Sequence, residues 1–271
     1  MNETETMRSN GCEDCPVHHP GNLIKLGVSL EGARYVVALA GNPNTGKSTV
    51  FNALTGLRQH TGNWPGKTVT RAEGGFSFGG NRYKVVDLPG TYSLLSTSAD
   101  EEAARDFILF GRPDVTIIVV DATRLERNLN LVLQVLEITD RVVICLNLID
   151  EARRHAIQVD DRLMSKELGV PVIPTVARQG EGIQALLGAV GDVATGTYQC
   201  RPHRILKYSG AINRAVQELT ADLEKKFPGL TNASWVALRL LEGDQRIADA
   251  VRTGELSSLT DHADTRKELI V

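Results

Sequence analysis

Residues 41–48 read Gly-Asn-Pro-Asn-Thr-Gly-Lys-Ser, and this stretch decides the fold of the chain. It has the pattern G-x-x-x-x-G-K-[ST] of a phosphate-binding loop, in which glycines permit tight turns that point backbone N–H groups at phosphates. An apolar, strand-like run precedes it at 35–40, and a helix-like run follows from Ser48 to Leu54. Strand, loop and helix in this order are the setting that the motif requires. The sequence therefore predicts a nucleotide-binding domain of the P-loop class.

The phosphate loop also predicts roles for single residues. Lys47 places a positive charge beside the β- and γ-phosphates, and the hydroxyl of Ser48 completes the coordination shell of Mg²⁺. The other contacts to the nucleotide from this loop are expected from Gly41, Asn42, Asn44, Thr45, Gly46 and Thr49.

A second motif selects the base. Asn147-Leu148-Ile149-Asp150 follows the apolar run 141–146, at the carboxyl end of a predicted buried strand, where open α/β sheets bind ligands. The Asp150 carboxylate can accept hydrogen bonds from N1–H and the 2-amino group of guanine, a donor pair that adenine lacks. Leu148 stands where this motif usually has lysine, which predicts weaker stacking over the base. GTP and GDP are therefore the expected nucleotides.

A further contact to guanine is expected through the backbone of Thr175-Val176-Ala177, which follows the short strand at 172–173. The usual S-A-K sequence of this element is V-A-R here, ending at Arg178. This departure predicts a loosely held base and fast release of GDP.

Two segments are expected to sense the γ-phosphate. Asp87-Leu88-Pro89-Gly90 follows a strand pattern, so Asp87 can hold a water bound to Mg²⁺ and the Gly90 N–H can face the γ-phosphate. Thr68 lies in a loop expected over 57–70 and is the expected second hydroxyl ligand of Mg²⁺. The alternative is that Thr68 only hydrogen-bonds its own backbone.

The attacking water has no obvious side-chain partner. Many GTPases have glutamine directly after D-x-x-G, where this chain has Thr91, and the run up to Leu95 contains no general base. We therefore expect slow hydrolysis that depends on positioning and electrostatics, with Lys47, Thr68, Gly90 and the backbone of Thr91 as the catalytic groups. A nucleotide sensor with negligible turnover is the alternative.

Taken together, three segments resemble one known family. They are Gly-Asn-Pro-Asn-x-Gly-Lys-Ser, then Gly62-Asn63-Trp64-Pro65-Gly66-x-Thr68-Val69, then Asp87-Leu88-Pro89-Gly90-Thr91-Tyr92-Ser93-Leu94. Their combination resembles the cytosolic N-terminal domain of ferrous iron transport protein B (FeoB), densely over about 35–190 and less specifically over 200–271. The segment G-N-W-P-G-x-T-V is the discriminating one, because generic small GTPases lack it.

The resemblance implies further properties. It implies a helical, GDI-like domain after the GTPase domain, a membrane permease for ferrous iron beyond it, and a place on the cytoplasmic face of the bacterial inner membrane. It implies K⁺ stimulation, with the ion held by Asn44 and by backbone carbonyls of Gly62 and Trp64. The alternative for Asn44 is a turn-forming residue. The resemblance also leaves open two kinds of partner, small accessory proteins of iron uptake and further copies of the same chain in a homo-oligomer.

Composition is that of an ordinary globular chain. The 271 residues are 42% hydrophobic and 23% charged, with a formal net charge of −3, so no basic patch favours a nucleic-acid partner. No apolar run approaches the roughly 18 residues of a spanning helix, and the polar N-terminus is unlike a signal peptide, so we expect a soluble chain.

Four cysteines are too few and too dispersed for a disulfide framework. Cys145 lies in a predicted strand as a small apolar filler, and Cys200 in a linker. Close to the N-terminus, a C-x-x-C pair is followed by two histidines, and these four side chains could bind a transition metal. A disordered extension is the favoured interpretation. The four residues are Cys12, Cys15, His18 and His19.

The order of patterns predicts the organisation of the chain. An N-terminal extension, largely disordered and ending in a short strand, is expected over 1–33, a GTPase domain over 34–194 and a helical domain over 200–271. Strands and helices alternate in the GTPase domain, which predicts an α/β fold with a mostly parallel sheet of six to seven strands flanked by helices. A hairpin at Gly79-Gly80 supplies an antiparallel edge strand. In the third part Trp235 and Leu238, three residues apart, are expected in a core.

The nucleotide motifs also fit one other functional class. A K⁺-stimulated GTPase that acts in ribosome assembly or RNA modification would share the nucleotide motifs. The acidic net charge and the lack of a recognisable RNA-binding module count against it.

Overall fold

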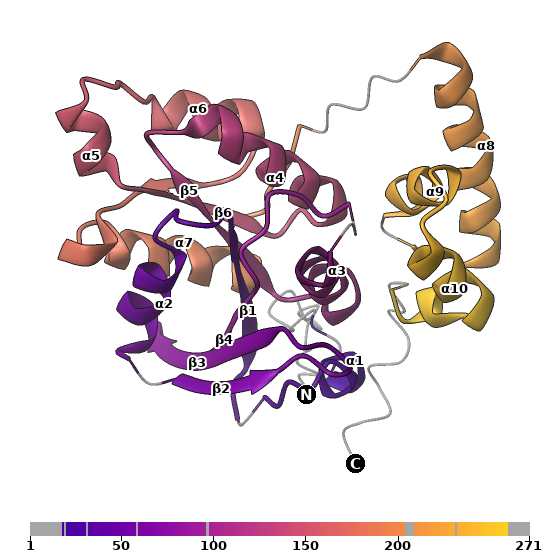
Figure 1. Ribbon diagram of the computed structural model, residues 1–271, viewed down its shortest axis with the longest axis horizontal. Helices are drawn as coiled ribbons and strands as arrows, with labels where there is room; N and C mark the ends of the chain where they lie inside the picture. The colour runs from indigo at the N-terminus through magenta and orange to yellow at the C-terminus, as the bar shows by residue number, and fades with distance from the viewer. Residues whose placement is uncertain are drawn as a thin grey trace, which may run out of the picture.

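The structure, a computed structural model, describes residues 18, 20–30, 32–57, 59–95, 98–203, 209–230 and 232–259. In this part of the chain seven strands form one sheet in the order β2-β3-β4-β1-β5-β6-β7 (Figure 1). Neighbours from β4 to β7 are parallel, whereas β2, β3 and β4 pair antiparallel. The predicted α/β fold is confirmed. The strands are β1 (Tyr35–Gly41), β2 (Gln59–Asn63), β3 (Thr70–Phe78), β4 (Asn81–Asp87), β5 (Val115–Asp121), β6 (Val142–Asn147) and β7 (Val172–Pro174).

Helices cover both faces of the sheet (Figure 1). α2 and α7 pack on one face, and α3, η1, α4, α5 and α6 share the core on the other. The helices of this part are α2 (Lys47–Thr55), α3 (Ala99–Asp106), the π-helix η1 (Phe107–Gly111), α4 (Leu125–Ile138), α5 (Ile149–Arg154), α6 (Asp161–Leu168), the 3₁₀ turn η2 (Ala177–Gln179) and α7 (Ile183–Thr195).

The central strands are apolar along their whole length because both of their faces are covered. Every residue of β1, β5 and β6 is buried, and continuous apolar runs of this kind are typical of parallel strands under two helical layers. Cys145 in β6 has no exposed surface, and its burial raises the pKa of the thiol to about 12. Its predicted role as a small apolar residue that fills the core is confirmed.

The antiparallel edge of the sheet is larger than expected. The hairpin between β3 and β4 turns at Gly79 and Gly80, both with positive φ, as predicted. The expectation of a loop throughout 57–70 is wrong, because Gln59–Asn63 forms β2 and pairs with β3. The sequence of β2 is polar and does not alternate, so its pairing comes from the open edge that β3 offers and not from a hydrophobic pattern.

The segment before β1 is packed against the domain. The expected short strand is wrong: Pro20–Lys25 forms helix α1. From α1 onward the prediction of disorder is wrong as well, since Leu23 and Val28 are buried in the core. The Asn22 side-chain amide donates to the carbonyl of Phe110 and to the hydroxyl of Ser258, both at 2.9 Å.

The four metal-ligand candidates fall mostly outside the described residues, which include only His18. Its Nδ1 lies 2.7 Å from the carboxylate of Asp114, a side chain with no exposed surface. Asp114 also accepts from the Val36 N–H at 2.7 Å, so the pair fixes the chain beside the start of β1. Among the described residues no group of three or more His, Cys, Asp or Glu side chains could hold a metal. The proposed ligands Cys12, Cys15 and His19 lie in the part that is not described.

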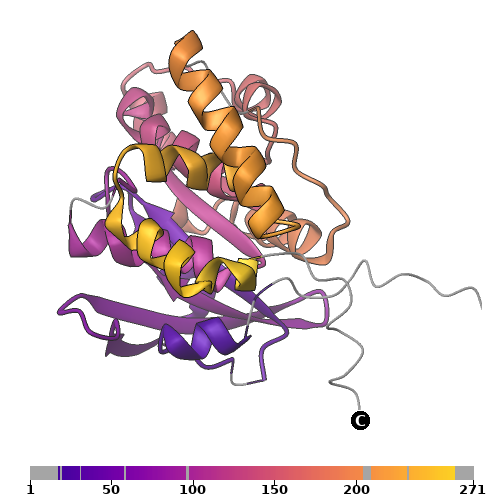
Figure 2. The same cartoon turned by 90° about the vertical axis from the view of Figure 1, so that its right-hand side faces the viewer.

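A smaller helical part follows the α/β part and packs beside α3 (Figures 1 and 2). Trp235 and Leu238 are each 7% exposed, so their predicted place in a core is confirmed. The sequence pattern also predicts a helix over 262–271, and these residues lie outside the described part of the chain. The elements are α8 (Gly210–Lys226), α9 (Ala233–Leu241), α10 (Gln245–Thr253) and η3 (Glu255–Leu259).

Two arginines join the parts. Arg105 on α3 has no exposed side-chain surface and contacts Asp244, the N-cap of α10, at 2.7 Å. Arg246 on α10 reaches back to Asp106 at 3.2 Å and to Glu255 at 2.7 Å. Because buried charges must be paired, these contacts fix how α10 sits on α3.

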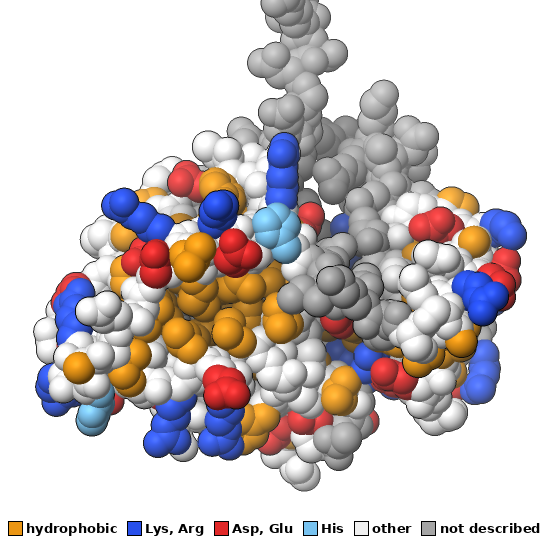
Figure 3. All heavy atoms as spheres, turned by 90° about the horizontal axis from the view of Figure 1, so that it is seen from above, with side chains coloured by type: hydrophobic (Ala, Val, Ile, Leu, Met, Phe, Trp, Pro, Cys, Tyr) orange, Lys and Arg blue, Asp and Glu red, His pale blue; other side chains and the backbone are white. Residues whose placement is uncertain are grey.

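The surface gives two further observations. In the view from above Figure 1, hydrophobic side chains gather on the exposed face of the α/β part, bordered by charged side chains of both signs (Figure 3). Among the described residues no helix is both long enough and apolar enough to cross a membrane.

Candidate functional site

The phosphate loop connects β1 to α2 at the carboxyl end of the sheet. Gly46 adopts a left-handed conformation (φ 82°) directly before α2. A Cβ on Gly41 would lie 2.7 Å from the Val119 carbonyl oxygen, and one on Gly46 would lie 2.4 Å from the Asn147 side-chain nitrogen. The loop is therefore a tight cradle that only glycine fits at both positions. The Thr45 hydroxyl closes it by donating to the Asn42 carbonyl at 2.9 Å.

Asn147, at the end of β6, ties the base-reading segments to the phosphate loop. Its side-chain nitrogen donates to the Thr45 carbonyl at 3.0 Å. Its side-chain oxygen accepts from the Ala177 N–H at 3.1 Å and lies 3.3 Å from the Thr175 hydroxyl. Asn147 and Thr175 are each 1% exposed. Val176 is buried as well. Three of the motifs predicted from sequence therefore meet at the side-chain amide of Asn147.

Asp150 presents a free acceptor beside this junction. One carboxylate oxygen accepts from Arg178 at 2.6 Å. The other, Oδ1, is buried and has no hydrogen-bond partner in the described part of the chain. A buried carboxylate oxygen without a donor is costly, and a ligand that supplies N–H donors removes that cost. This orphaned atom fits the guanine donor edge that the sequence predicts for it. The contact between Asp150 and Arg178 was not predicted. Its only signal in the sequence is the arginine that replaces the usual lysine of the S-A-K element.

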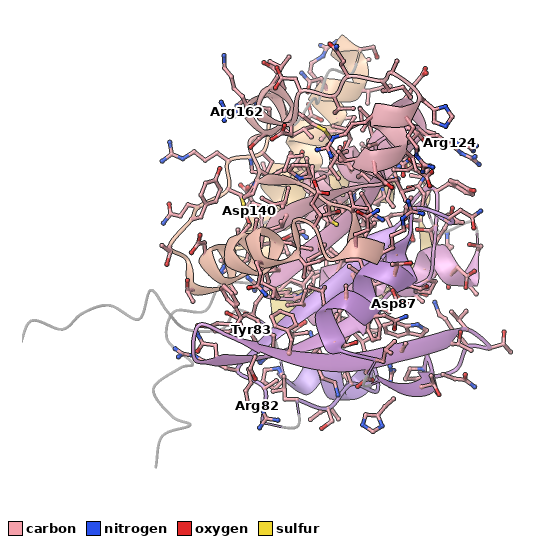
Figure 4. All side chains as sticks on the ribbon, turned by 90° about the vertical axis from the view of Figure 1, so that its left-hand side faces the viewer. Arg82, Tyr83, Asp87, Arg124, Asp140 and Arg162 are labelled. Atoms are coloured by element: carbon pink, nitrogen blue, oxygen red, sulfur yellow. The ribbon has the colours of Figure 1, made fainter. Side chains whose placement is uncertain are left out.

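Lys47 and Asp87 meet under the phosphate loop. The Lys47 ammonium lies 2.5 Å from the Asp87 carboxylate at the end of β4. Burial raises the pKa of Asp87, and the charge and hydrogen bond of Lys47 oppose that rise. Figure 4 shows Asp87 at the same end of the sheet as Arg124, opposite the end that carries Tyr83 and Asp140. The predicted partners at the γ-phosphate are thus brought together, with Ser48 exposed one residue along.

The segment around Trp64 and Thr68, expected over 57–70 and here called the first switch, is held on the edge of the sheet. Trp64 is 3% exposed, with the Arg71 guanidinium 5.2 Å from its ring centroid and the Phe107 ring 5.5 Å away. Gly62 pairs with Arg71 across the β2–β3 ladder, and the Trp64 carbonyl accepts from the Lys67 N–H at 3.0 Å. Thr68 is exposed. The described contacts of Gly62, Trp64 and Lys67 run to β3, α3 and η1, so the structure does not bring these residues to the phosphate loop.

The segment that begins at Asp87 and runs to Leu95, here called the second switch, lies against the phosphate loop. A Cβ on Gly90 would be 3.5 Å from Pro43, and Thr91 is 5% exposed. Asn44 has a positive φ of 66° and is exposed, as expected for its alternative role in the turn. This backbone leaves its side chain free, so both interpretations of Asn44 stand. A cavity of about 380 Å³ opens beside the loop, lined among others by Pro43, Asn44, Tyr92 and Arg127.

A phosphate loop between β1 and α2, an asparagine at the end of β6 followed closely by an aspartate, and an aspartate at the end of β4 define a P-loop nucleotide-binding domain. Comparison with protein-family models narrows the class. The model described as ferrous iron transport protein B matches residues 35–190, and that of the FeoB cytosolic helical domain matches 208–270. The chain belongs to the ferrous iron transport protein B family, whose G domain is a P-loop GTPase.

Individual relatives support the same family. The chain is 40% identical over 235 residues to the Fe(2+) transporter FeoB of Escherichia coli K12, which covers 85% of this chain and 29% of that transporter. The chain thus spans less than a third of the length of this curated relative. The cytosolic domain of L. pneumophila FeoB superposes with a TM-score of 0.73 at 36% identity, covering 84% of this chain and 90% of that one. The cytosolic domain of T. maritima FeoB in its GMPPNP form gives 0.72 at 36% identity, covering 81% and 86%.

Proposed function

We propose that this chain binds GTP and hydrolyses it to GDP and phosphate. The observation that carries the proposal is the buried, unpartnered Oδ1 of Asp150, held next to an asparagine that is bonded to the phosphate loop. A carboxylate in this place selects guanine over adenine by its donor edge. The relatives solved with GDP and with GMPPNP support a guanine nucleotide.

Residue roles follow from the same geometry. Lys47 and the amides of the loop from Gly41 to Thr49 bind the phosphates, while Asn147, Asp150 and the 175–177 backbone bind the base. The oxygens of Ser48, of Thr68 and, through water, of Asp87 suit Mg²⁺, which would neutralise charge on the phosphates. Thr68 must move toward the phosphate loop to join this set, because it is exposed on the sheet edge.

Hydrolysis in this proposal depends on positioning. The segment after Gly90 offers backbone N–H groups and no side-chain base, and buried Thr91 replaces the glutamine of many GTPases. Amides fixed near the γ-phosphate stabilise its developing charge and orient water, whereas proton abstraction by the protein contributes little. We therefore expect slow intrinsic turnover.

Potassium stimulation is the finer part of the proposal, with Asn44 as a ligand and the carbonyls of Gly62 and Trp64 completing the site once the first switch moves. We expect the wild type to hydrolyse GTP at least about tenfold faster in K⁺ than in Na⁺, because a cation beside the phosphates supplies transition-state charge. The variant Asn44→Ala should lose most of that difference and keep its GDP affinity. Phosphate release, measured in matched KCl and NaCl, tests both statements.

The outcomes separate the parts of the proposal. No hydrolysis in either salt contradicts the GTPase assignment and favours a sensor. Full K⁺ stimulation of Asn44→Ala removes Asn44 from the ion site and leaves the GTPase assignment intact.

We further propose that this GTPase regulates or drives ferrous iron uptake from the cytoplasmic face of the bacterial inner membrane. The G domain would span 34–194 and the helical domain 200–271, which agrees with family matches over 35–190 and 208–270. Its partners would be a permease, small accessory proteins of iron uptake and further copies of itself. The reading frame beyond Val271 tests this: long apolar segments are expected there, and a basic module in their place would contradict it.

A further inference from the structure

Helix α4 carries a polar face that belongs to none of the nucleotide motifs. Its apolar residues, among them Leu131 and Val135, are buried in the core. Arg127, Asn130 and Gln134 are spaced three and four residues apart and so lie on one side of the helix. They match no nucleotide-binding motif, so their position must be explained by what they contact.

All three side chains contact the second switch just after Thr91. The Arg127 guanidinium lies 4.1 Å from the centroid of the Tyr92 ring. The Asn130 side-chain amide donates to the Tyr92 carbonyl at 3.4 Å. The Gln134 side-chain oxygen accepts from the Leu94 N–H at 2.6 Å, and its nitrogen donates to Asn130 at 3.4 Å.

These contacts hold Tyr92 in place, which burial in the core does not. Tyr92 is 40% exposed, so its ring is held by Arg127 on the surface and not by burial, whereas its neighbours Thr91 and Leu94 are 5% and 3% exposed. A cation over an aromatic ring and a hydrogen bond from a backbone N–H each restrict the backbone between them. The segment from Tyr92 to Leu94 is therefore fastened to α4 at a ring, a carbonyl and an amide.

The fastened segment adjoins the phosphate site. Tyr92 and Arg127 line the same cavity as Pro43 and Asn44 of the phosphate loop, and Gly90 lies against Pro43. Because hydrolysis here relies on backbone amides at Gly90 and Thr91, small displacements of this segment change the reaction rate strongly.

We propose that Arg127, Asn130 and Gln134 are positioning residues for GTP hydrolysis, which hold the second switch so that the amides of Gly90 and Thr91 face the γ-phosphate. This inference rests on the proposed GTPase function. These three side chains would compensate for the missing glutamine. Other GTPases position the reacting groups with a side chain of the switch itself, whereas here a neighbouring helix would position the switch. Among the described residues none of the three side chains is hydrogen-bonded to the phosphate loop or to Asp150, so we expect nucleotide affinity to change little when they are replaced.

The decisive variant is Gln134→Leu, which removes the acceptor for the Leu94 N–H and leaves an apolar side chain that is one atom shorter. Hydrogen exchange, followed in the peptide that contains Leu94, should become faster by about fivefold, the effect expected from one lost hydrogen bond. Single-turnover hydrolysis should slow by a similar factor, while GDP affinity should stay within about twofold. Gln134→Glu retains an acceptor oxygen, so its exchange rate near Leu94 and its rate of hydrolysis should both be close to those of the wild type.

Two more variants complete the test. Gln184→Leu makes the same chemical change at an exposed position of α7 and should leave exchange and hydrolysis unchanged. Arg127→Met removes the charge over Tyr92 at an exposed site, so it serves if Gln134→Leu does not fold. Unchanged exchange near Leu94 overturns the contact itself, and faster exchange with normal hydrolysis overturns the positioning role. Wild-type protein that hydrolyses no GTP overturns the proposed function, whereas the exchange experiment still decides whether α4 holds the switch.

Discussion

Replacing Asp150 by asparagine is expected to weaken GDP binding by roughly a hundredfold, about 3 kcal/mol. The reason lies in Arg178, which donates to one Asp150 oxygen at 2.6 Å. Arginine is only a donor, so it will take the single oxygen of the asparagine amide. The amide nitrogen must then face the base, where it sets a donor against the N1–H and 2-amino donors of guanine. Isothermal titration with GDP measures the loss.

The same substitution should change which purine is preferred. Xanthine carries a carbonyl oxygen where guanine has its 2-amino group, and this oxygen can accept from the new amide. We therefore expect the ratio of xanthosine to guanosine diphosphate affinity to rise by more than about tenfold in Asp150→Asn. Asp140→Asn, an exposed position at the opposite end of the sheet, is the matched control (Figure 4). If Asp150→Asn binds GDP as tightly as the control does, Asp150 does not read the base.

The nucleotide site could be predicted from sequence because its residues follow strands. Asp87 ends β4, Asn147 ends β6, and the phosphate loop follows β1, and parallel neighbours bring these ends to one edge of the sheet. Apolar runs locate such strands reliably when both faces are buried. Topology then places the motifs together, although their separation along the chain is large.

Contacts that depend on the packing of side chains could not be predicted in the same way. β2 has no hydrophobic alternation, so its pairing with β3 left no pattern in the sequence. The position of α1 could not be predicted either, because this short helix is fixed by burial of Leu23 and by hydrogen bonds from Asn22 to Phe110 and Ser258, residues far along the chain. The polar face of α4 resembles any solvated helix face until Tyr92 and Leu94 are found beside it.

Trp64 shows why a motif can predict a role without predicting a conformation. The segment around it is a family signature for the first switch, and flexible glycine and proline suggested a loop. The buried ring, packed between Arg71 and Phe107, instead anchors the segment to β3 and η1. Movement of Thr68 toward the phosphates in the proposed cycle therefore requires either a hinge after Trp64 or withdrawal of its ring from the core.

The variant Gly46→Ala should cost about 3 kcal/mol of unfolding free energy and reduce GDP affinity by at least about a hundredfold. Two causes act at one position. The left-handed backbone, with φ of 82°, costs an alanine about 1–2 kcal/mol. The new methyl group would also lie 2.4 Å from the Asn147 side-chain nitrogen. Asn147 cannot move away cheaply, because Thr45 and Ala177 hold both ends of its amide.

The chain contains a matched control for the second cause. Gly56 also has a left-handed backbone, with φ of 62°, but a Cβ there meets nothing within 4 Å. Gly56→Ala should therefore lose only the unfolding free energy that the left-handed backbone costs an alanine, about 1 kcal/mol, and should bind GDP normally. Urea unfolding followed by far-UV circular dichroism, with GDP titrations on both variants, separates the two effects. Equal stability losses and equal GDP affinities would mean that the methyl group at residue 46 is accommodated, and that Asn147 is not the fixed link between the base and the phosphate loop.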